Sequence, residues 1–274
     1  MNRSHLAGLM AFALLVCLSM PLVAQDEGPY IVTVMRAHWN MDMEDFSMEE
    51  WKKHEMEYHE KVIMKNEYIV GSAVLLHTYT PDNSEILFGQ VYANWADVEK
   101  AVDRNRELAQ EAWPDDEERS AFFDKQGSYY SHIHSDEIYS TMSLAKPLSE
   151  LPTEPVLYYL RTSHTAPSPE DGSGDEVQAL RKEYVENVIH KSEHVMGYYP
   201  MRHLYGADSR DMIEVMVVKD MADLEAMNDG GLQKLVEAQW PDQEQRNAFF
   251  DSMDKYMEPW HSDLIYTCVP ELMK

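Results

Sequence analysis

The fold of this chain is decided by a stretch that occurs twice, first as WPDDEERSAFFDKQGSYYSHIHSDEIY at residues 113–139 and again as WPDQEQRNAFFDSMDKYMEPWHSDLIY at residues 240–266. The two copies are identical at 15 of 27 aligned positions. The match continues upstream, where residues 57–79 correspond to residues 183–205 at an offset of 126 instead of 127. A repeat of this length indicates that one structural module is present twice.

The repeat also divides the chain into domains. We place the first module at residues 29–144 and the second at residues 154–270. Between them lies a linker at residues 145–153, which prolines interrupt at both ends.

Each module shows the same order of predicted elements. In the first module, strands are expected from alternating and β-branched residues at 30–38, 70–79, 85–92 and 134–142. Helices are expected at residues 48–66 and 95–111, and Pro114 is expected to open a further helix. The order β-α-β-β-α-β predicts an α+β module of the ferredoxin-like type.

This duplicated pattern resembles the dimeric α/β-barrel superfamily, which includes antibiotic-biosynthesis-monooxygenase-like, EthD-like and chlorite-dismutase-like proteins. The resemblance is architectural and covers the whole of residues 29–270. It implies that the two ferredoxin-like modules form one intramolecular α/β barrel. It further implies a small ligand in that barrel and oxygenase-like chemistry, either cofactor-independent or haem-dependent. Because such folds host many reactions, the resemblance does not by itself fix the function.

The charge of the chain restricts its partners. The 274 residues include 49 acidic and 23 basic side chains, for a net charge of −26. A field this negative repels phosphate backbones, so we expect no nucleic-acid partner. No segment after the first 24 residues is apolar for long enough to predict a membrane span. The small-molecule partner is what the resemblance implies, and the oligomeric state stays open.

The first 24 residues predict a secretory signal peptide. Arg3 precedes an apolar run at residues 6–16, and Ala24 fits the position before a signal-peptidase cut. We therefore expect a periplasmic or secreted protein. A lipoprotein anchored through Cys17 is the alternative, but Val16 is larger than the small residue such a signal needs before its cysteine.

Two residue types recur on one predicted strand of each module. His77 and Tyr79 reappear as His203 and Tyr205. If that face lines the barrel, the pairs meet near the pseudo-twofold axis and form a ligand pocket. If it packs under the helices, the histidines have local structural roles, and alternation alone does not decide between the faces.

The last predicted strand carries a second recurring motif. His134 and Asp136 reappear as His261 and Asp263, each pair around a serine. A histidine beside a carboxylate can act as an oriented base or a metal ligand. We favour the alternative, a hydrogen-bonding motif at the entry of the strand.

A third motif suggests a metal. His190, Glu193 and His194 form H-x-x-E-H, a pattern found in some zinc hydrolases. The first module has Met64 and Tyr68 at the histidine positions, which argues against a metallohydrolase. Nucleotide-binding and C-x-x-C motifs are absent from the sequence, which leaves haem or a metal ion as the cofactors to consider.

These observations define two main hypotheses. The first is a secreted protein that binds a small ligand in its barrel and acts as an oxygenase-like enzyme. The second is a non-catalytic secreted protein that uses the same fold for binding or assembly. A hollow barrel lined by the recurring histidines favours the first hypothesis, whereas a densely packed barrel favours the second.

The signal peptide can be tested directly. We expect the exported protein to begin near Gln25, as N-terminal sequencing or intact-mass measurement of the secreted fraction would show. A lipid-modified N-terminus at Cys17 would establish the lipoprotein alternative instead.

Overall fold

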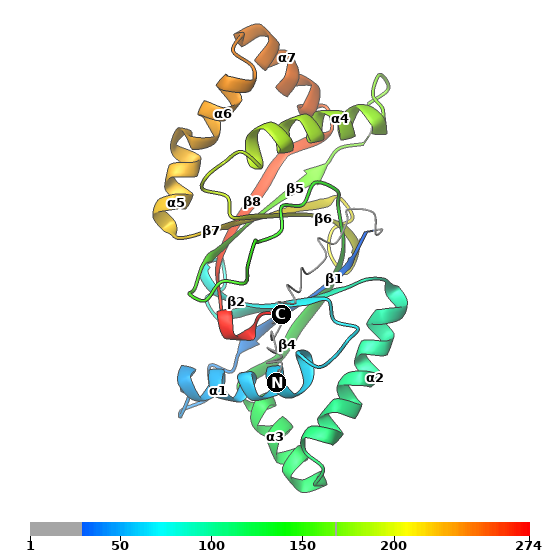
Figure 1. Cartoon of the computed structure of the whole chain (residues 1–274), viewed down its shortest axis with the longest axis vertical. Coiled ribbons are helices and arrows are strands. Elements are labelled where there is room, and N and C mark those ends of the chain that lie inside the picture. Colours follow the sequence, from blue (N-terminus) through cyan, green and yellow to red (C-terminus); the bar gives the residue numbers. More distant parts are fainter. Residues whose placement is uncertain (1–28, 168) are drawn as a thin grey trace, which may run out of the picture.

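The computed structural model describes residues 29–167 and 169–274, so the predicted signal peptide lies outside the described residues. Its centre is a closed barrel of eight strands in the order β1-β3-β2-β8-β5-β7-β6-β4. The helices of the first module cover one side of this barrel and those of the second module the opposite side (Figure 1). The α+β class and the intramolecular barrel are thereby confirmed.

The two modules contribute four strands each. The first module supplies β1 (Ile31–Trp39), β2 (Gly71–Tyr79), β3 (Glu85–Tyr92) and β4 (Tyr130–Thr141). The second supplies β5 (Leu157–Thr165), β6 (Gly197–Tyr205), β7 (Asp211–Val218) and β8 (Met257–Cys268). Within each module the spatial order is fourth, first, third and second strand, which is the ferredoxin-like arrangement.

The helices follow the predicted order with differences at their ends. The first module has α1 (Met48–Tyr58), its π-helical continuation η1 (His59–Ile63), α2 (Trp95–Ala112) and α3 (Asp116–Ser128). The second has α4 (Gly174–Tyr184), η2 (Val185–Ile189), α5 (Met221–Ala226), η3 (Met227–Gly231), α6 (Leu232–Gln239) and α7 (Gln243–Asp254). A 3₁₀ turn, η4 (Pro270–Leu272), follows β8.

The expectation that Pro114 opens a helix is wrong by two residues. Asp115 is the N-cap of α3, and its carboxylate accepts hydrogen bonds from the backbone N–H groups of Glu117 and Glu118. A carboxylate that satisfies two free N–H groups also complements the helix dipole, so Asp115 fixes the start of the helix and Pro114 lies just outside it.

The interior of the barrel is a single hydrophobic core. Every strand contributes to it, for example Val32 of β1, Leu75 of β2 and Met201 of β6, and three tyrosines fill much of its volume. Those tyrosines are Tyr139, Tyr158 and Tyr266, all less than 8% exposed. The middle of the barrel is thus densely packed, as the second hypothesis expects.

Two strand pairings between the modules close the barrel. β2 pairs with β8 through residues 265–268, and β4 pairs with β6 through residues 138–141. Both β4 and β8 continue beyond these contacts as long strands. In the described structure their first halves, residues 130–137 and 257–264, pair on one side only, with β1 and β5 respectively.

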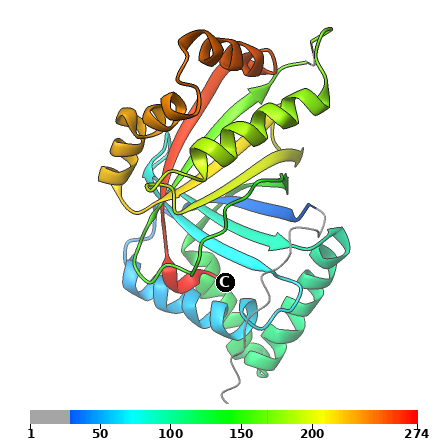
Figure 2. The same cartoon turned by 45° about the horizontal axis from the view of Figure 1, so that its top comes forward.

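The C-terminal segment of the second module crosses onto the first. Leu272 and Val269 pack with Trp51 of α1 and Ile86 of β3. The backbone of Lys274 exchanges two hydrogen bonds with that of Ser72, at 3.0 and 3.1 Å. Figure 2 shows this segment lying against α1, where it completes the packing between helix and sheet.

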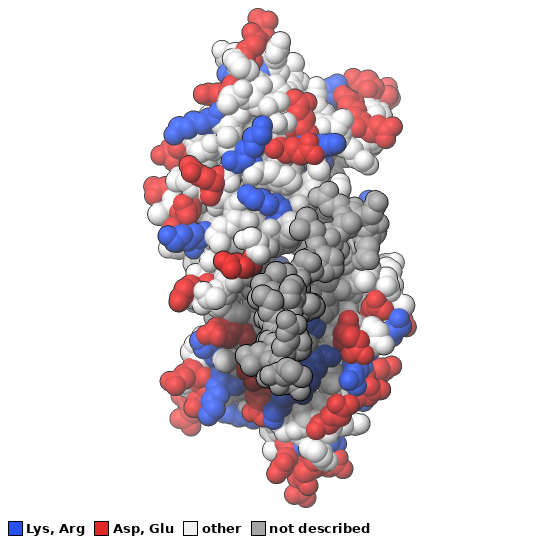
Figure 3. All heavy atoms as spheres, in the orientation of Figure 1, with Lys and Arg blue, Asp and Glu red and all other residues white. Residues whose placement is uncertain are grey.

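Acidic side chains are spread over both helical layers on the face seen in Figure 3, interspersed with lysines and arginines. Within residues 29–167 and 169–274, no helix has the length and apolar character needed to cross a membrane.

The crossing C-terminal segment should contribute measurably to stability. Leu272 is 2% exposed, so Leu272→Ala should lower the free energy of unfolding by about 2–4 kcal/mol, through lost burial and a residual cavity. Leu151 is 49% exposed, and Leu151→Ala is the matched control that should stay within about 0.5 kcal/mol. Urea unfolding measures both variants, and equal effects would contradict the packing role.

Candidate functional site

His77 and His203 face the interior of the barrel at the same end. Leu75 and Met201, two residues earlier on the same strands, belong to the interior core, and alternate residues share a face. β2 and β6 run in the same direction because an even number of antiparallel pairings separates them. Alternation in the sequence did not show which strand face points into the barrel. In the structure it is the face that carries His77 and His203. Their role as ligand contacts stays a prediction.

The two histidines have different surroundings. Nδ1 of His77 lies 2.8 Å from the Thr80 hydroxyl, within the turn between β2 and β3. Nε2 of His203 is buried and has no hydrogen-bond partner among the described residues. Tyr79 and Tyr205 are each 63% exposed and follow irregularities in the strand pairing, so they do not join the histidines inside the barrel.

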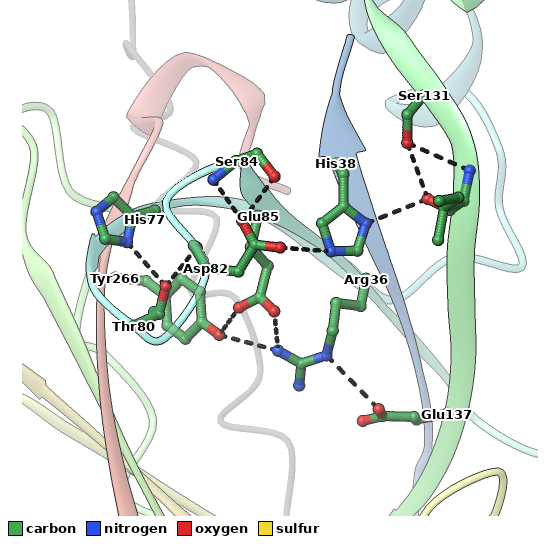
Figure 4. Close-up of polar contacts among 11 residues, drawn as sticks. Arg36, His38, His77, Thr80, Asp82, Ser84, Glu85, Ser131, Glu137 and Tyr266 are labelled. Atoms are coloured by element: carbon green, nitrogen blue, oxygen red, sulfur yellow. Dashed lines mark hydrogen bonds and ion pairs between the residues drawn. The ribbon is translucent and has the colours of Figure 1, made fainter. Parts of the chain in front are cut away.

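A polar network fills this end of the barrel on the side of the first module (Figure 4). Arg36 lies 2.6 Å from a carboxylate oxygen of Glu85 and 3.6 Å from Glu137. Tyr266 donates a hydrogen bond to Glu85 and accepts one from Arg36 at 3.1 Å. Burial disfavours the charge of Arg36, but its hydrogen bond to Glu85 and the two nearby carboxylates hold the pKa of Arg36 above its ordinary value. The network pairs the partly buried guanidinium of Arg36 with two carboxylates inside the barrel.

A further set of residues that recurs in both modules lies at this end of the barrel and was not predicted from the sequence. His38, Asp82 and Glu85 correspond to His164, Asp208 and Asp211, all at the offset of 126 found in the upstream repeat. The offset of 126 is the sequence signal for this set, because it aligns Asp82 of the predicted polar turn with Asp208.

The His-Ser-Asp motifs lie on the outer face of the sheet, away from the barrel interior. His134 and His261 are half-exposed, and their Nε2 atoms lie 3.3 and 3.2 Å from carboxylate oxygens of Asp136 and Asp263. Asp263 also accepts a hydrogen bond of 2.6 Å from Tyr159. The motifs are located in the middle of β4 and β8, whereas we expected them to open these strands. This arrangement matches the hydrogen-bonding interpretation better than a shared pocket.

The H-x-x-E-H segment is not helical, because η2 ends at Ile189. His190 Nε2 lies 2.9 Å from the Leu144 carbonyl oxygen, and His194 Nδ1 lies 2.9 Å from a carboxylate oxygen of Asp223. Glu193 is 90% exposed. The one-turn spacing that would bring both histidines onto one metal is therefore absent from this segment.

A cavity of about 390 Å³ lies outside the barrel, between the sheet of the first module and its helices. Its walls come from α1, η1, α3, the outer face of β1–β4 and the C-terminal segment. The lining is mostly apolar, with polar groups from Glu55, His59, Ser72, Gln90 and Gln126. A second hollow of about 400 Å³ is a groove bordered by α2 and α3.

Glu55 is the central polar group of the cavity. It is 5% exposed, and its carboxylate accepts a hydrogen bond of 2.8 Å from Tyr130 and bonds of 3.0 and 3.1 Å from Gln126. Trp51 in turn donates to the Tyr130 oxygen at 2.7 Å. Burial raises the pKa of Glu55 above its ordinary value, although these hydrogen bonds oppose the rise. A carboxyl group in this environment is a stronger base than an exposed one.

The second module fills the equivalent space with side chains. In β-sheet register, the Ser72–Gln90 pair of the first module corresponds to the Tyr198–Met216 pair of the second. Tyr198 is fully buried within the helix–sheet core, whereas the Ser72 hydroxyl is buried without a partner among the described residues. A serine in the cavity lining of the first module thus takes the position of a tyrosine that is fully buried in the second.

The cavity does not fit haem. His59 is the one histidine in its lining, and its Nε2 lies 3.2 Å from the carbonyl oxygen of Met273, to which it is positioned to donate. Among the described residues, no lysine or arginine lines the cavity to pair with the propionate groups of haem, and the Glu55 carboxylate would repel them. The residues of this cavity therefore do not suit haem.

Comparison with known proteins supports the fold alone. No protein-family profile matches the chain, and no curated protein matches its sequence. Among solved structures, a putative monooxygenase from Fusobacterium nucleatum subsp. nucleatum aligns with a TM-score of 0.54 at 9% identity, over 88% of this chain and 93% of its own. An anthrone oxidase-like protein aligns with a TM-score of 0.52 at 13% identity, over 91% and 94%.

A looser similarity connects the chain to a chlorite dismutase from Candidatus Nitrospira defluvii, with a TM-score of 0.49 at 14% identity over 88% of this chain and 92% of that one. The two better alignments extend over both modules and agree with the barrel topology described above. This chain therefore has the fold of the dimeric α/β-barrel superfamily, with both ferredoxin-like modules in one polypeptide.

Proposed function

We propose that this protein is exported and binds a small, mainly aromatic molecule with a weakly acidic hydroxyl group in the helix–sheet cavity of its first module. The observation that carries the proposal is the buried Glu55 carboxyl group at an otherwise largely apolar cavity. A cavity of about 390 Å³ lies within the ~300–1,000 Å³ typical of small-molecule sites.

The surroundings of Glu55 suit proton transfer from such a ligand. Tyr130 and Gln126 hold the carboxylate in place, and the raised pKa makes it a better proton acceptor. An apolar cavity of this volume accommodates fused aromatic rings, and the hydroxyl of the ligand would approach the remaining lone pairs of the carboxylate. The proton would pass from the ligand oxygen to Glu55.

The proposed activity is oxygenase-like and uses neither haem nor another cofactor. The structural neighbours include a putative monooxygenase and an anthrone oxidase-like protein, and an anthrone is an aromatic ketone of three fused rings. Removal of a ligand proton by Glu55 is the step that this cavity can perform with its own residues.

The cavity should bind 2-naphthol more tightly than naphthalene. A hydrogen bond to a charged group is worth about 1.5–3 kcal/mol, so we expect a preference of about tenfold or more, measured by fluorescence titration. Glu55→Gln should reduce this preference. Equal affinities in the wild-type protein would contradict the proposed site.

Filling the cavity should abolish binding. Ser72→Phe introduces a ring at the position where the second module already holds Tyr198, and Phe88 replaces the Glu214 that accepts the Tyr198 hydrogen bond. Tyr198→Phe is the matched control, because it leaves the first module unchanged and should keep 2-naphthol affinity within twofold. Naphthol binding that survives Ser72→Phe would place the ligand elsewhere.

The pH dependence of stability tests the state of Glu55. Because its pKa is raised in the folded protein, the folded state binds this proton more tightly than the unfolded chain does. The bound proton stabilises the folded state fully below the ordinary glutamate pKa. This stabilisation is lost as the pH rises through the raised pKa of Glu55. Relative to Glu55→Gln, wild-type stability should fall by about 1.4 kcal/mol per pH unit in that window. Urea unfolding between pH 4 and pH 8 measures it, and a constant difference would contradict the raised pKa.

A further inference from the structure

We propose that His164, Asp208 and Asp211 bind a divalent transition-metal cation at the end of the barrel, with His203 as a fourth ligand. One ligand atom from each of the first three residues lies within 4.8 Å of the others. They come from β5, the turn before β7 and the first residue of β7, so a rigid sheet positions two of them. This site is separate from the cavity that contains Glu55 and does not depend on it.

His164 is already held in the orientation a metal ligand needs. Its Nε2 lies 3.3 Å from a carboxylate oxygen of Asp211, and its Nδ1 lies 3.4 Å from Glu258. Its ring stacks on Trp260 with the centroids 3.9 Å apart. Metal-binding histidines commonly direct their second ring nitrogen at a carboxylate, which fixes the tautomer and the ring plane. Glu258 occupies that place here.

His203 supplies an independent indication. The antiparallel pairing of β6 and β7 ends at Arg202–Met212, and His203 and Asp211 are the next residues on the two strands. Nε2 of His203 is buried without a hydrogen-bond partner in the described structure. A buried imidazole nitrogen left unpaired costs free energy, which a metal bond would recover.

Comparison of the two modules shows that the second has no arginine at the register position of Arg36. In the first module Glu85 is neutralised by Arg36 at 2.6 Å. Arg36 pairs with Ser135 in the sheet, and Thr162 occupies the same place opposite Ser262 in the second module. Asp211, the counterpart of Glu85, therefore has no arginine at that register position. A bound cation would supply the charge that Arg36 supplies in the first module.

Among the described residues, the Asp211 carboxylate forms an ion pair only with His164, at 3.3 Å. Arg210 lies 2.7 Å from Asp208 and 2.8 Å from Glu258, so it pairs with these two carboxylates and not with Asp211. Imidazole and carboxylate ligands together suit Zn²⁺, Mn²⁺ or Fe²⁺.

Zinc titration of the mature chain tests the proposal. After chelator treatment and dialysis, isothermal titration with zinc chloride should give one ion per chain. His164→Gln and Asp211→Asn should each weaken binding at least tenfold, and His203→Gln should weaken it several-fold. Asp211→Glu should retain binding, because glutamate is accepted at the equivalent position 85. Circular dichroism and metal-free melting curves show whether each variant is folded.

His38→Gln is the matched control, since His38 is the counterpart of His164 in the module that has Arg36. It should leave zinc affinity within twofold. A double variant, His134→Gln with His261→Gln, removes the exposed histidine–aspartate pairs and should also leave the single site intact. The proposal is overturned if the wild-type chain takes up no stoichiometric zinc, if folded Asp211→Asn binds as the wild type does, or if the double variant abolishes binding.

Discussion

Pairing of β2 with β8 and of β4 with β6 is the constraint on which the rest of the structure depends. A single ferredoxin-like sheet would leave its second and fourth strands as open edges and its inner face without a partner. Closing the ring removes those edges over their shared length and allows all eight strands to pack into one core. The cavity and the polar end of the barrel both depend on this closure. The cavity uses the outer face of a sheet whose inner face is buried by the neighbouring module. The polar end of the barrel uses the inner face, and helices bury the outer one.

The two modules have the same backbone arrangement, and they differ in individual side chains. Trp113 on Phe122 and Trp240 on Phe249 show nearly the same stacking, with centroids 4.0 and 4.1 Å apart. Two other positions differ. The first module has Ser72 where the second has Tyr198 in its helix–sheet core, and the second module has Thr162 where the first has Arg36 at the end of the barrel. Duplication thus preserved the packing that defines the module, while each copy acquired its own polar site.

Much of the fold could be predicted from the sequence, because periodicity and repetition are local signals. The strand at residues 85–92 was predicted with the observed ends. The inward orientation of His77 could not be predicted, since alternation defines two faces without saying which one meets the other module. The cavity could not be predicted either: Ser72 is unremarkable until the structure places it opposite the register position of Tyr198.

Residues 130–137 and 257–264 pair on one side only, so the negative charge of the chain affects whether two molecules can associate along these strands. Such half-open strands are templates for association between molecules. Asp136 lies exposed on one of them and Asp263 on the other, so a second copy that approached either edge would bring like charges together. Pro259 also removes one N–H donor from the second edge. This protection is electrostatic, so it weakens as ionic strength shortens the Debye length from about 10 Å at 0.1 M to about 3 Å at 1 M. The barrier to association along these edges thus depends on the salt in the surroundings.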